Sequence, residues 1–293
     1  MNRESTEAFL AHRNLLFTVA YEMLGSAADA EDVLQETWLR WAEVDLDEVR
    51  DQRAYLVRIT TRLALNRIRT LARRRESYVG PWLPEPLLTA PDVADDVELA
   101  DSVSTAMLLV LETLSPTERA VFVLREVFDL PYDEIAAAVD KSPAAVRQIA
   151  HRARNHVEAR QPREAVDRRT QDEVLDRFLA AVRGGDVQDL MDVLAPDVVL
   201  ITDGGGKRQA ALRPIEGADK VLRFLAAVMP EEGVEVRADA VVVNGAPAMR
   251  LYLDGQLDTV ASMKVAGGVV VGLYVVRNPD KLGRVEDEVP LTR

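Results

Sequence analysis

The stretch Tyr132–His156, YDEIAAAVDKSPAAVRQIAHRARNH, decides how the middle of the chain folds. It predicts a short helix, a turn at Asp140–Ser142 and a second helix, which is the pattern of a helix-turn-helix. Ser142 is a typical N-cap, and the proline after it favours the first turn of the second helix. Small alanines on the packed side allow the two helices to approach closely. An ordinary helical pair with a basic exposed face is the alternative.

The exposed side of the second predicted helix carries polar and basic residues suited to DNA. Arg147, Gln148 and His151 lie in its N-terminal half, where side chains of such helices contact base edges. Arg152 and Arg154 are better placed to contact phosphates. These five residues form the first group of candidate DNA-binding residues.

The distribution of charge supports contact with DNA, although the chain is acidic overall, with a net charge of −13. Residues 50–75 contain nine basic residues and one acidic residue, and residues 141–163 contain six basic residues and one acidic residue. Because local charge decides whether a surface attracts phosphates, two basic segments in an acidic chain are candidate nucleic-acid contacts.

Composition excludes several other classes of protein. The chain has no cysteine, which excludes disulfides and thiolate metal sites and fits a cytoplasmic protein. No stretch of about 18 uncharged apolar residues is present, so neither a membrane span nor a membrane partner is expected. The length of 293 residues suggests two or three domains.

Residues from about 5 to 75 are expected to be helical throughout. From Ala30 onward, apolar residues recur at helical spacing and form one buried stripe, consisting of Val33, Leu34, Trp38 and Trp41. The opposite face of this helix carries the acidic and polar residues Asp32, Gln35 and Glu36. Such a face suits a basic helical partner, although acidic helix faces are usually only solvated.

The rest of the chain divides into a linker, more helices and a mixed C-terminal part. Residues 77–100 are rich in proline and then in aspartate, which indicates a linker. Helices resume near Asp101, and Ser115–Glu118 forms a capping box with proline at the first helical position. Beyond residue 164 the pattern predicts α+β structure, with helices at 172–182, 187–194 and 218–228 and strands at 197–202, 234–243, 247–253, 258–265 and 269–276.

The helix-turn-helix region carries a resemblance to a known family. Leu114–Arg154 resembles the −35-reading domain of extracytoplasmic-function (ECF) RNA polymerase sigma factors, and the matching residues are Arg119, Tyr132, Glu134, Ile135, Ala136, Val146, Arg147, Arg152, Ala153 and Arg154. A ligand-responsive helix-turn-helix regulator that is not a sigma factor would share such a domain. That regulator is the alternative function.

The N-terminal helices favour the sigma factor. Asp29–Trp38 resembles the helix with which sigma factors bind the clamp helices of the β′ subunit, which makes Asp32, Gln35 and Glu36 the implied polymerase contacts. A second helix, predicted from about Arg53 to Arg74, resembles the −10-reading segment and implies DNA contacts by Arg58, Arg62, Asn66 and Arg69. Arg62 departs from the asparagine that many ECF factors have there, so −10 specificity does not transfer. The implied partners are core RNA polymerase, through its β and β′ subunits, and promoter DNA.

Three short segments, which we call the signature segments, narrow the family further. Trp82–Pro86 is WLPEP, Asp203–Lys207 is DGGGK and Asn278–Leu282 is NPDKL. Their joint order resembles the ECF group with a fused C-terminal SnoaL-like domain. WLPEP is a stiff extended segment suited to docking against another domain, or else a surface linker. The predicted interdomain regulatory residues are Trp82, Pro84, Pro86, Asp203, Lys207, Asn278 and Asp280.

The resemblance implies a multidomain fold. An all-α region 2 bundle is expected over 1–76, a linker over 77–100, an all-α region 4 helix-turn-helix over 101–163 and a cone-shaped α+β SnoaL-like domain over 164–293. The three histidines, His12, His151 and His156, all lie outside the last domain. Because no acid–base pair is evident from the spacing, no enzyme activity, cofactor or metal is expected. The last domain is expected to regulate the sigma domains, and an unidentified small ligand is a further expected partner.

Overall fold

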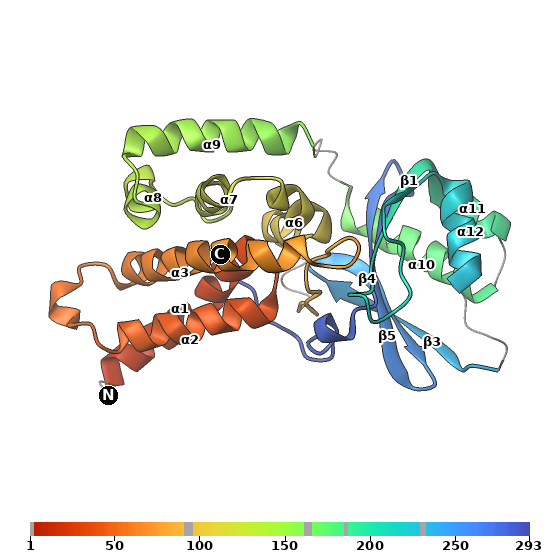
Figure 1. The fold of residues 1–293 in the computed structure, drawn as a ribbon, viewed down its shortest axis with the longest axis horizontal. Coiled ribbons are helices and arrows are strands. Elements are labelled where there is room, and N and C mark those ends of the chain that lie inside the picture. The colour runs from red at the N-terminus through yellow and green to blue at the C-terminus, as the bar shows by residue number, and fades with distance from the viewer. Residues whose placement is uncertain (1–2, 91–95, 161–165, 185–186, 229–232) are drawn as a thin grey trace.

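The computed structural model describes residues 3–90, 96–160, 166–184, 187–228 and 233–293. Helices make up the N-terminal half, and a mixed sheet with three further helices makes up the C-terminal part (Figure 1). The predicted boundary near residue 163 lies outside the described residues. No helix among the described residues combines the length and the apolar character that crossing a membrane requires.

The N-terminal bundle consists of α1 (Arg3–Leu24), α2 (Ala27–Trp41) and α3 (Gln52–Glu76), with a short 3-10 turn at Leu46–Glu48. The Ser26 side chain caps α2 by accepting a hydrogen bond from the Asp29 amide. Trp41, from the predicted apolar stripe, is fully buried, and its indole nitrogen donates to the Ser5 carbonyl at 2.8 Å.

The second helical part contains α5 (Val97–Val103), α6 (Thr105–Glu112), α7 (Pro116–Phe122), α8 (Tyr132–Val139) and α9 (Pro143–Glu158), with a π-helical segment at Val123–Val127. Ser115 and Glu118 form the predicted capping box at the start of α7. Ser142 caps α9, and Asp140 ends α8 in the left-handed conformation, with φ 56°. The helix-turn-helix is therefore present as expected.

The C-terminal part is built on a six-stranded sheet of order β2-β1-β6-β5-β4-β3. Its strands are β1 (Leu194–Asp203), β2 (Ile215–Glu216), β3 (Val236–Val243), β4 (Ala246–Leu253), β5 (Gln256–Ala266) and β6 (Val269–Val276). β1 pairs with β6 in parallel, and the other pairs are antiparallel. Five of the six strands match predicted ones. β2 has only two residues, too few to produce a periodic pattern.

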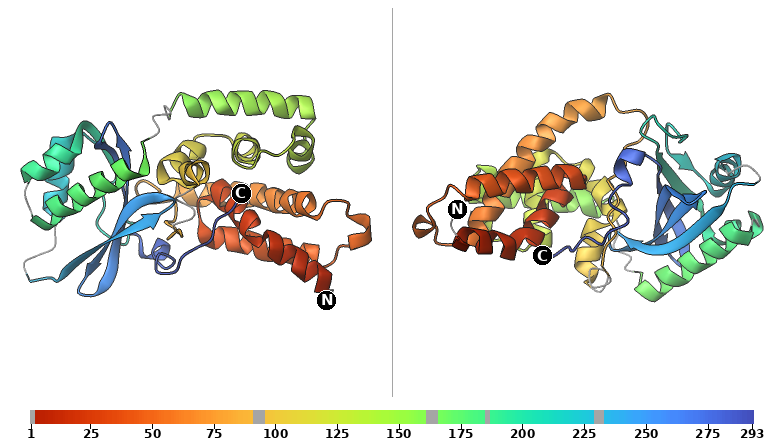
Figure 2. Two further views of the ribbon diagram at one scale, coloured as in Figure 1. Left: turned by 180° about the vertical axis from the view of Figure 1, so that it is seen from behind. Right: turned by 90° about the horizontal axis from the view of Figure 1, so that it is seen from below.

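The two faces of the sheet meet different parts of the chain. The helices α10 (Arg168–Gly184), α11 (Val187–Val193) and α12 (Ala218–Val228) lie along one face and share an apolar core with it (Figures 1 and 2). On the other face Val243, Val260 and Val276 pack with Leu83 of the linker and Leu282 near the C-terminus. The described part of the linker is therefore an interdomain layer and not a surface connection.

The last residues of the chain return to the N-terminal bundle (Figure 2). The Val289 amide donates to the Leu88 carbonyl at 2.8 Å, and the Thr292 amide donates to the Thr18 hydroxyl at 3.1 Å. Leu291 is 3% exposed and belongs to the apolar core of the helical half. The C-terminal tail thus packs against the N-terminal bundle.

Candidate functional sites

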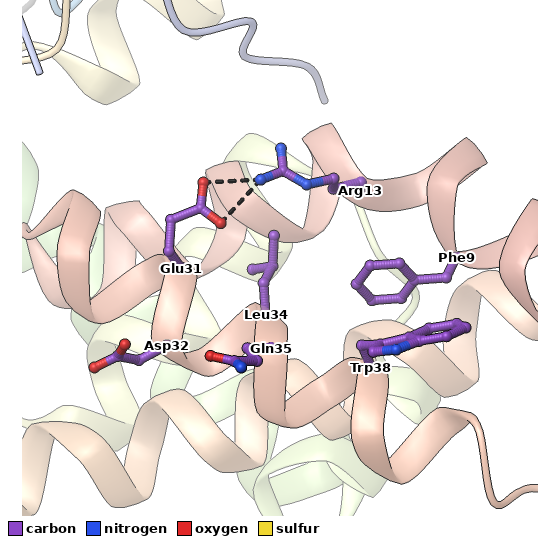
Figure 3. Close-up of a pocket in the computed structure, with 7 residues that line it drawn as sticks. All are labelled: Phe9, Arg13, Glu31, Asp32, Leu34, Gln35 and Trp38. Carbon is purple, nitrogen blue, oxygen red and sulfur yellow. Dashed lines mark hydrogen bonds and ion pairs between the residues drawn. The ribbon is translucent and has the colours of Figure 1, made fainter.

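The exposed face of α2 borders a groove with an apolar floor and a charged rim (Figure 3). The Phe9 and Trp38 rings, with centroids 5.2 Å apart, line one end. Arg13 forms two 2.9 Å hydrogen bonds to the Glu31 carboxylate on the rim. The groove is completed by Leu34 and by the predicted residues Asp32 and Gln35.

The three predicted residues of α2 are accessible, and the two acidic ones already form ion pairs within the chain. The Asp32 side chain is 63% exposed and pairs with Arg67 at 2.9 Å. Glu36 is 53% exposed and pairs with Arg40 at 2.6 Å. Ion pairs at such exposed sites are weak, so a partner could replace them at little cost. Gln35 is exposed on the same face.

The basic face of α3 lies against the helix-turn-helix. The Arg62 guanidinium donates to the Ala137 carbonyl of α8 at 2.8 Å. Arg58 stacks over the Tyr55 ring, 4.6 Å from its centroid, and lines a cleft that α8 closes with Asp133, Glu134 and Ala137. Asn66 and Arg69 are exposed farther along α3 and bond to each other at 3.3 Å. The second helical part thus contacts the predicted −10 surface at Arg58, which is half-buried, and at Arg62, which stays exposed.

The predicted −35 residues lie on α9 and are mostly open to solvent. Arg147, Gln148, His151 and Arg152 are exposed. Arg154 is different, because its guanidinium makes hydrogen bonds of 2.6 and 3.1 Å to the Glu126 carboxylate, which raises its pKa above the ordinary value. Only the first four side chains are therefore available to DNA without breaking a close ion pair.

The three signature segments meet around the Asp203 carboxylate, which is 1% exposed. It accepts hydrogen bonds from the Tyr78 hydroxyl at 2.5 Å, the Leu83 amide at 2.9 Å and the Lys281 ammonium at 2.8 Å. The pKa of the Tyr78 hydroxyl lies above its ordinary value. The main cause is burial, and the second is the hydrogen bond to the Asp203 carboxylate. Asn278, which is 3% exposed, donates to the same Tyr78 hydroxyl at 2.7 Å.

The remaining predicted interdomain residues surround this centre. Lys281 lies over the Trp82 ring, with 4.2 Å from its nitrogen to the ring centroid, and donates to the Leu83 carbonyl at 2.6 Å. Pro84 and Pro86 are buried. At the exposed edge, Lys207 pairs with Asp280 at 2.6 Å. All seven predicted interdomain residues therefore lie at or beside one interface.

Several residues of this interface were not in the predicted site. The Glu85 carboxylate accepts from the Ala27 amide at 2.8 Å and the Ala28 amide at 3.2 Å, so it holds the N-terminus of α2, where a negative charge is favourable. Glu85 belongs to a signature segment, but nothing in the local pattern names a partner 58 residues away. Tyr78, which donates to Asp203, and Asn244, whose side-chain oxygen accepts from the Leu87 amide at 2.9 Å, are further examples.

Comparison with known proteins agrees with this architecture. Residues 8–74 match the family model "Sigma-70 region 2", residues 104–157 match "Sigma-70, region 4" and residues 175–276 match "SnoaL-like domain". The chain is 37% identical to the "ECF RNA polymerase sigma factor SigJ" of Mycobacterium tuberculosis (strain ATCC 25618 / H37Rv), over 93% of this chain and 91% of that protein.

Further similarities extend over nearly the whole chain. The "Probable ECF RNA polymerase sigma factor SigI" of the same strain is 31% identical over 96% of both chains. The crystal structure of the Mycobacterium tuberculosis SigJ superposes with a TM-score of 0.75 at 34% identity, covering 94% of this chain and 97% of that one. The identity to SigJ over nearly the whole chain, together with the matches to sigma-70 regions 2 and 4 and to a SnoaL-like domain, shows the family. The chain belongs to the extracytoplasmic-function RNA polymerase sigma factors, in the group with a C-terminal SnoaL-like domain.

Proposed function

We propose that this chain binds core RNA polymerase through α2, reads the −35 element with α9 and the −10 element with α3, and initiates transcription. The polymerase role of Asp32, Gln35 and Glu36 is supported by their exposure beside a groove with an apolar floor. A basic helical partner would complement such a surface in both shape and charge. The match of residues 8–74 to sigma region 2 disfavours the alternative of a helix-turn-helix regulator that is not a sigma factor.

We further propose that the free chain is closed against −10 DNA. The observation that carries this proposal is the contact of α8 with α3, in which Arg62 is bonded to Ala137 and the Arg58 cleft is lined by the acidic Asp133 and Glu134. Promoter phosphates or flipped bases would need the same surface. The polymerase face of α2 stays exposed in this arrangement. Polymerase binding can therefore precede the release of α3.

The C-terminal domain is proposed to hold the closed arrangement in cis. Support comes from the buried Asp203 centre, where the linker and the C-terminal domain share hydrogen bonds. A covalent tether keeps the two parts at high effective concentration, so weak contacts can hold them together. We propose a regulatory role and no catalytic one. No described contact supports the predicted small ligand, which is not part of the proposal.

The test is transcription and core binding in vitro with purified core RNA polymerase. Reversing two charges, Asp32→Lys with Glu36→Lys, should weaken core binding at least tenfold, because both carboxylates lie on the proposed contact face. The control, Asp172→Lys with Asp176→Lys, reverses two exposed charges at the same helical spacing on α10. Circular dichroism checks that both variants are folded. Equal core binding by the two folded variants would remove the α2 assignment.

A further inference from the structure

The turn between β3 and β4 is buried between domains, unlike a matching turn of the same sheet. Asn244 is 1% exposed, and a Cβ on Gly245 would lie 2.6 Å from the Ala100 Cα of α5. Asp254 and Gly255 form the β4–β5 turn with the same left-handed backbone, yet a Cβ on Gly255 would meet no atom within 4 Å. The sheet therefore presents this type of turn to solvent at Asp254–Gly255 and to the helical half at Asn244–Gly245.

The Asn244 side chain makes three hydrogen bonds, each to a separate segment of the chain. Its amide nitrogen donates to the Tyr21 hydroxyl of α1 at 2.6 Å and to the Val103 carbonyl of α5 at 2.8 Å. Its amide oxygen accepts from the Leu87 amide of the linker at 2.9 Å. Tyr21 in turn donates to the Glu85 carbonyl at 2.7 Å. One side chain thus joins the first helix, the linker and the helix that leads into region 4.

The backbone of the hairpin adds to this contact. The Asn244 amide donates to the Leu87 carbonyl at 2.9 Å, and the Thr89 amide donates to the Val242 carbonyl at 3.0 Å. The Gly245 amide donates to the Thr89 hydroxyl at 3.0 Å. Because main-chain bonds of this kind add an extended segment to a sheet edge, the linker is docked on β3 as well as on the side chain of Asn244.

The position requires asparagine for two independent reasons. Its φ of 54° is a conformation that glycine, asparagine and aspartate adopt more readily than other residues. Glycine would satisfy the backbone but would leave the Val103 carbonyl and the Leu87 amide without their partner. Aspartate would have no proton to donate to Val103 or Tyr21. The hairpin alone needs only the backbone conformation, so the side-chain requirement comes from the interdomain contact.

We propose that the Asn244–Gly245 turn is an interdomain docking site for the sigma domains, and that the chain opens by withdrawing this turn from the junction of α1, the linker and α5. The turn lies outside the three signature segments. Buried polar groups that lose a partner are costly, whereas the same groups are hydrated once the domains separate. Removing the Asn244 side chain therefore disfavours the docked position of the C-terminal domain specifically. The consequence for transcription rests on the proposed function, but the contact does not.

The test compares Asn244→Gly with the matched control Asp254→Gly in the full chain. Both variants keep the left-handed turn, and the control removes only an exposed hydrogen bond to the Glu235 amide. Hydrogen exchange of residues 83–89 and 99–105, followed by mass spectrometry, should become at least tenfold faster in Asn244→Gly, equal to about 1.4 kcal/mol, and stay unchanged in the control. Exchange in β5 monitors the fold of the C-terminal domain.

A second variant approaches the contact from the other side. Tyr21→Phe keeps the ring but removes the hydroxyl that Asn244 bonds, and it leaves the sequence of the C-terminal domain intact. Tyr21→Phe should also accelerate hydrogen exchange at residues 83–89. If Asn244→Gly changes exchange in β5, and so disturbs the C-terminal domain itself, the result for Tyr21→Phe is the one that tests the contact. Wild-type exchange at 83–89 in Tyr21→Phe and in folded Asn244→Gly would overturn the proposal. Failure of the wild-type chain to support transcription would instead overturn the proposed function, whatever the exchange rates.

Discussion

Glu22 of α1 is a fully buried carboxyl group whose charge state should control the contact between α1 and α5. Its Oε1 accepts a hydrogen bond from the Ser102 hydroxyl at 2.9 Å, whereas its Oε2 has no partner. Burial raises the pKa of Glu22 from 4.5 to about 8, against a smaller opposite effect of the Ser102 hydrogen bond. The neutral acid is therefore the favoured form at neutral pH in the folded chain.

The size and direction of the pH effect follow from these two pKa values. The folded chain binds this proton more tightly than the unfolded chain, so the contribution of Glu22 to stability is greatest below pH 4.5. It decreases as the pH rises and becomes constant above pH 8. The pKa values differ by about 3.5, and at about 1.4 kcal/mol per pH unit the full loss is about 5 kcal/mol.

Glu22→Gln removes the titration while keeping the shape of the side chain. The stability of this variant relative to the wild type should rise by about 3 kcal/mol between pH 5.5 and pH 8, measured by urea unfolding of the full chain. The control is Glu43→Gln, at an exposed site just after α2, which should follow the wild type. A constant difference between Glu22→Gln and the wild type across this range would refute the argument.

Other predictions concern the closed arrangement. Asp133→Lys with Glu134→Lys places positive charges opposite Arg58, so the free protein should bind single-stranded −10 DNA more tightly in a fluorescence titration; unchanged affinity would contradict the occlusion of α3. Asp203→Ala should lower the free energy of unfolding by about 3–5 kcal/mol, because Lys281, whose side chain is 12% exposed, loses its carboxylate partner. Asp280→Ala at the exposed pair should cost less than about 1 kcal/mol. Chemical denaturation of both compares them, and similar losses would argue against a buried centre. Leu291→Ala should destabilise the helical half by about 2 kcal/mol in thermal unfolding, since a buried leucine leaves its core; wild-type unfolding would mean that the tail is not docked.

Local sequence patterns predicted the elements well. The Ser115–Glu118 capping box and the Ser142 cap depend on residues within a few positions of one another, and both have the expected structure. Of the predicted buried stripe, Val33, Leu34 and Trp41 are buried, whereas Trp38 is half-buried and lines the groove beside α2. Helix periodicity and capping motifs arise from interactions between residues that are close in the sequence, so they can be recognised in the sequence itself. The family could be inferred for the same reason, because its motifs are short and contiguous.

The interdomain contacts depend instead on partners far apart in the chain. Asn244 and its glycine indicate a hairpin turn, but Tyr21, bonded to that asparagine, lies 223 residues earlier. Arg154, predicted to contact phosphates, is held by Glu126 28 residues away. A polar residue in a local pattern indicates that the group needs a hydrogen-bond partner when it is buried. The pattern does not indicate which distant segment supplies that partner.

The sequence by itself therefore determined the helices, most strands, the order of domains and the family. Only the tertiary structure decided that residues 83–87 of the linker are buried, that α8 packs against α3 and that Leu291 completes the core of the N-terminal half. The physical reason is that helix and strand formation follows from the periodic placement of neighbouring side chains. The choice of which surface covers which depends on packing and hydrogen bonding among segments that meet only after the chain has folded.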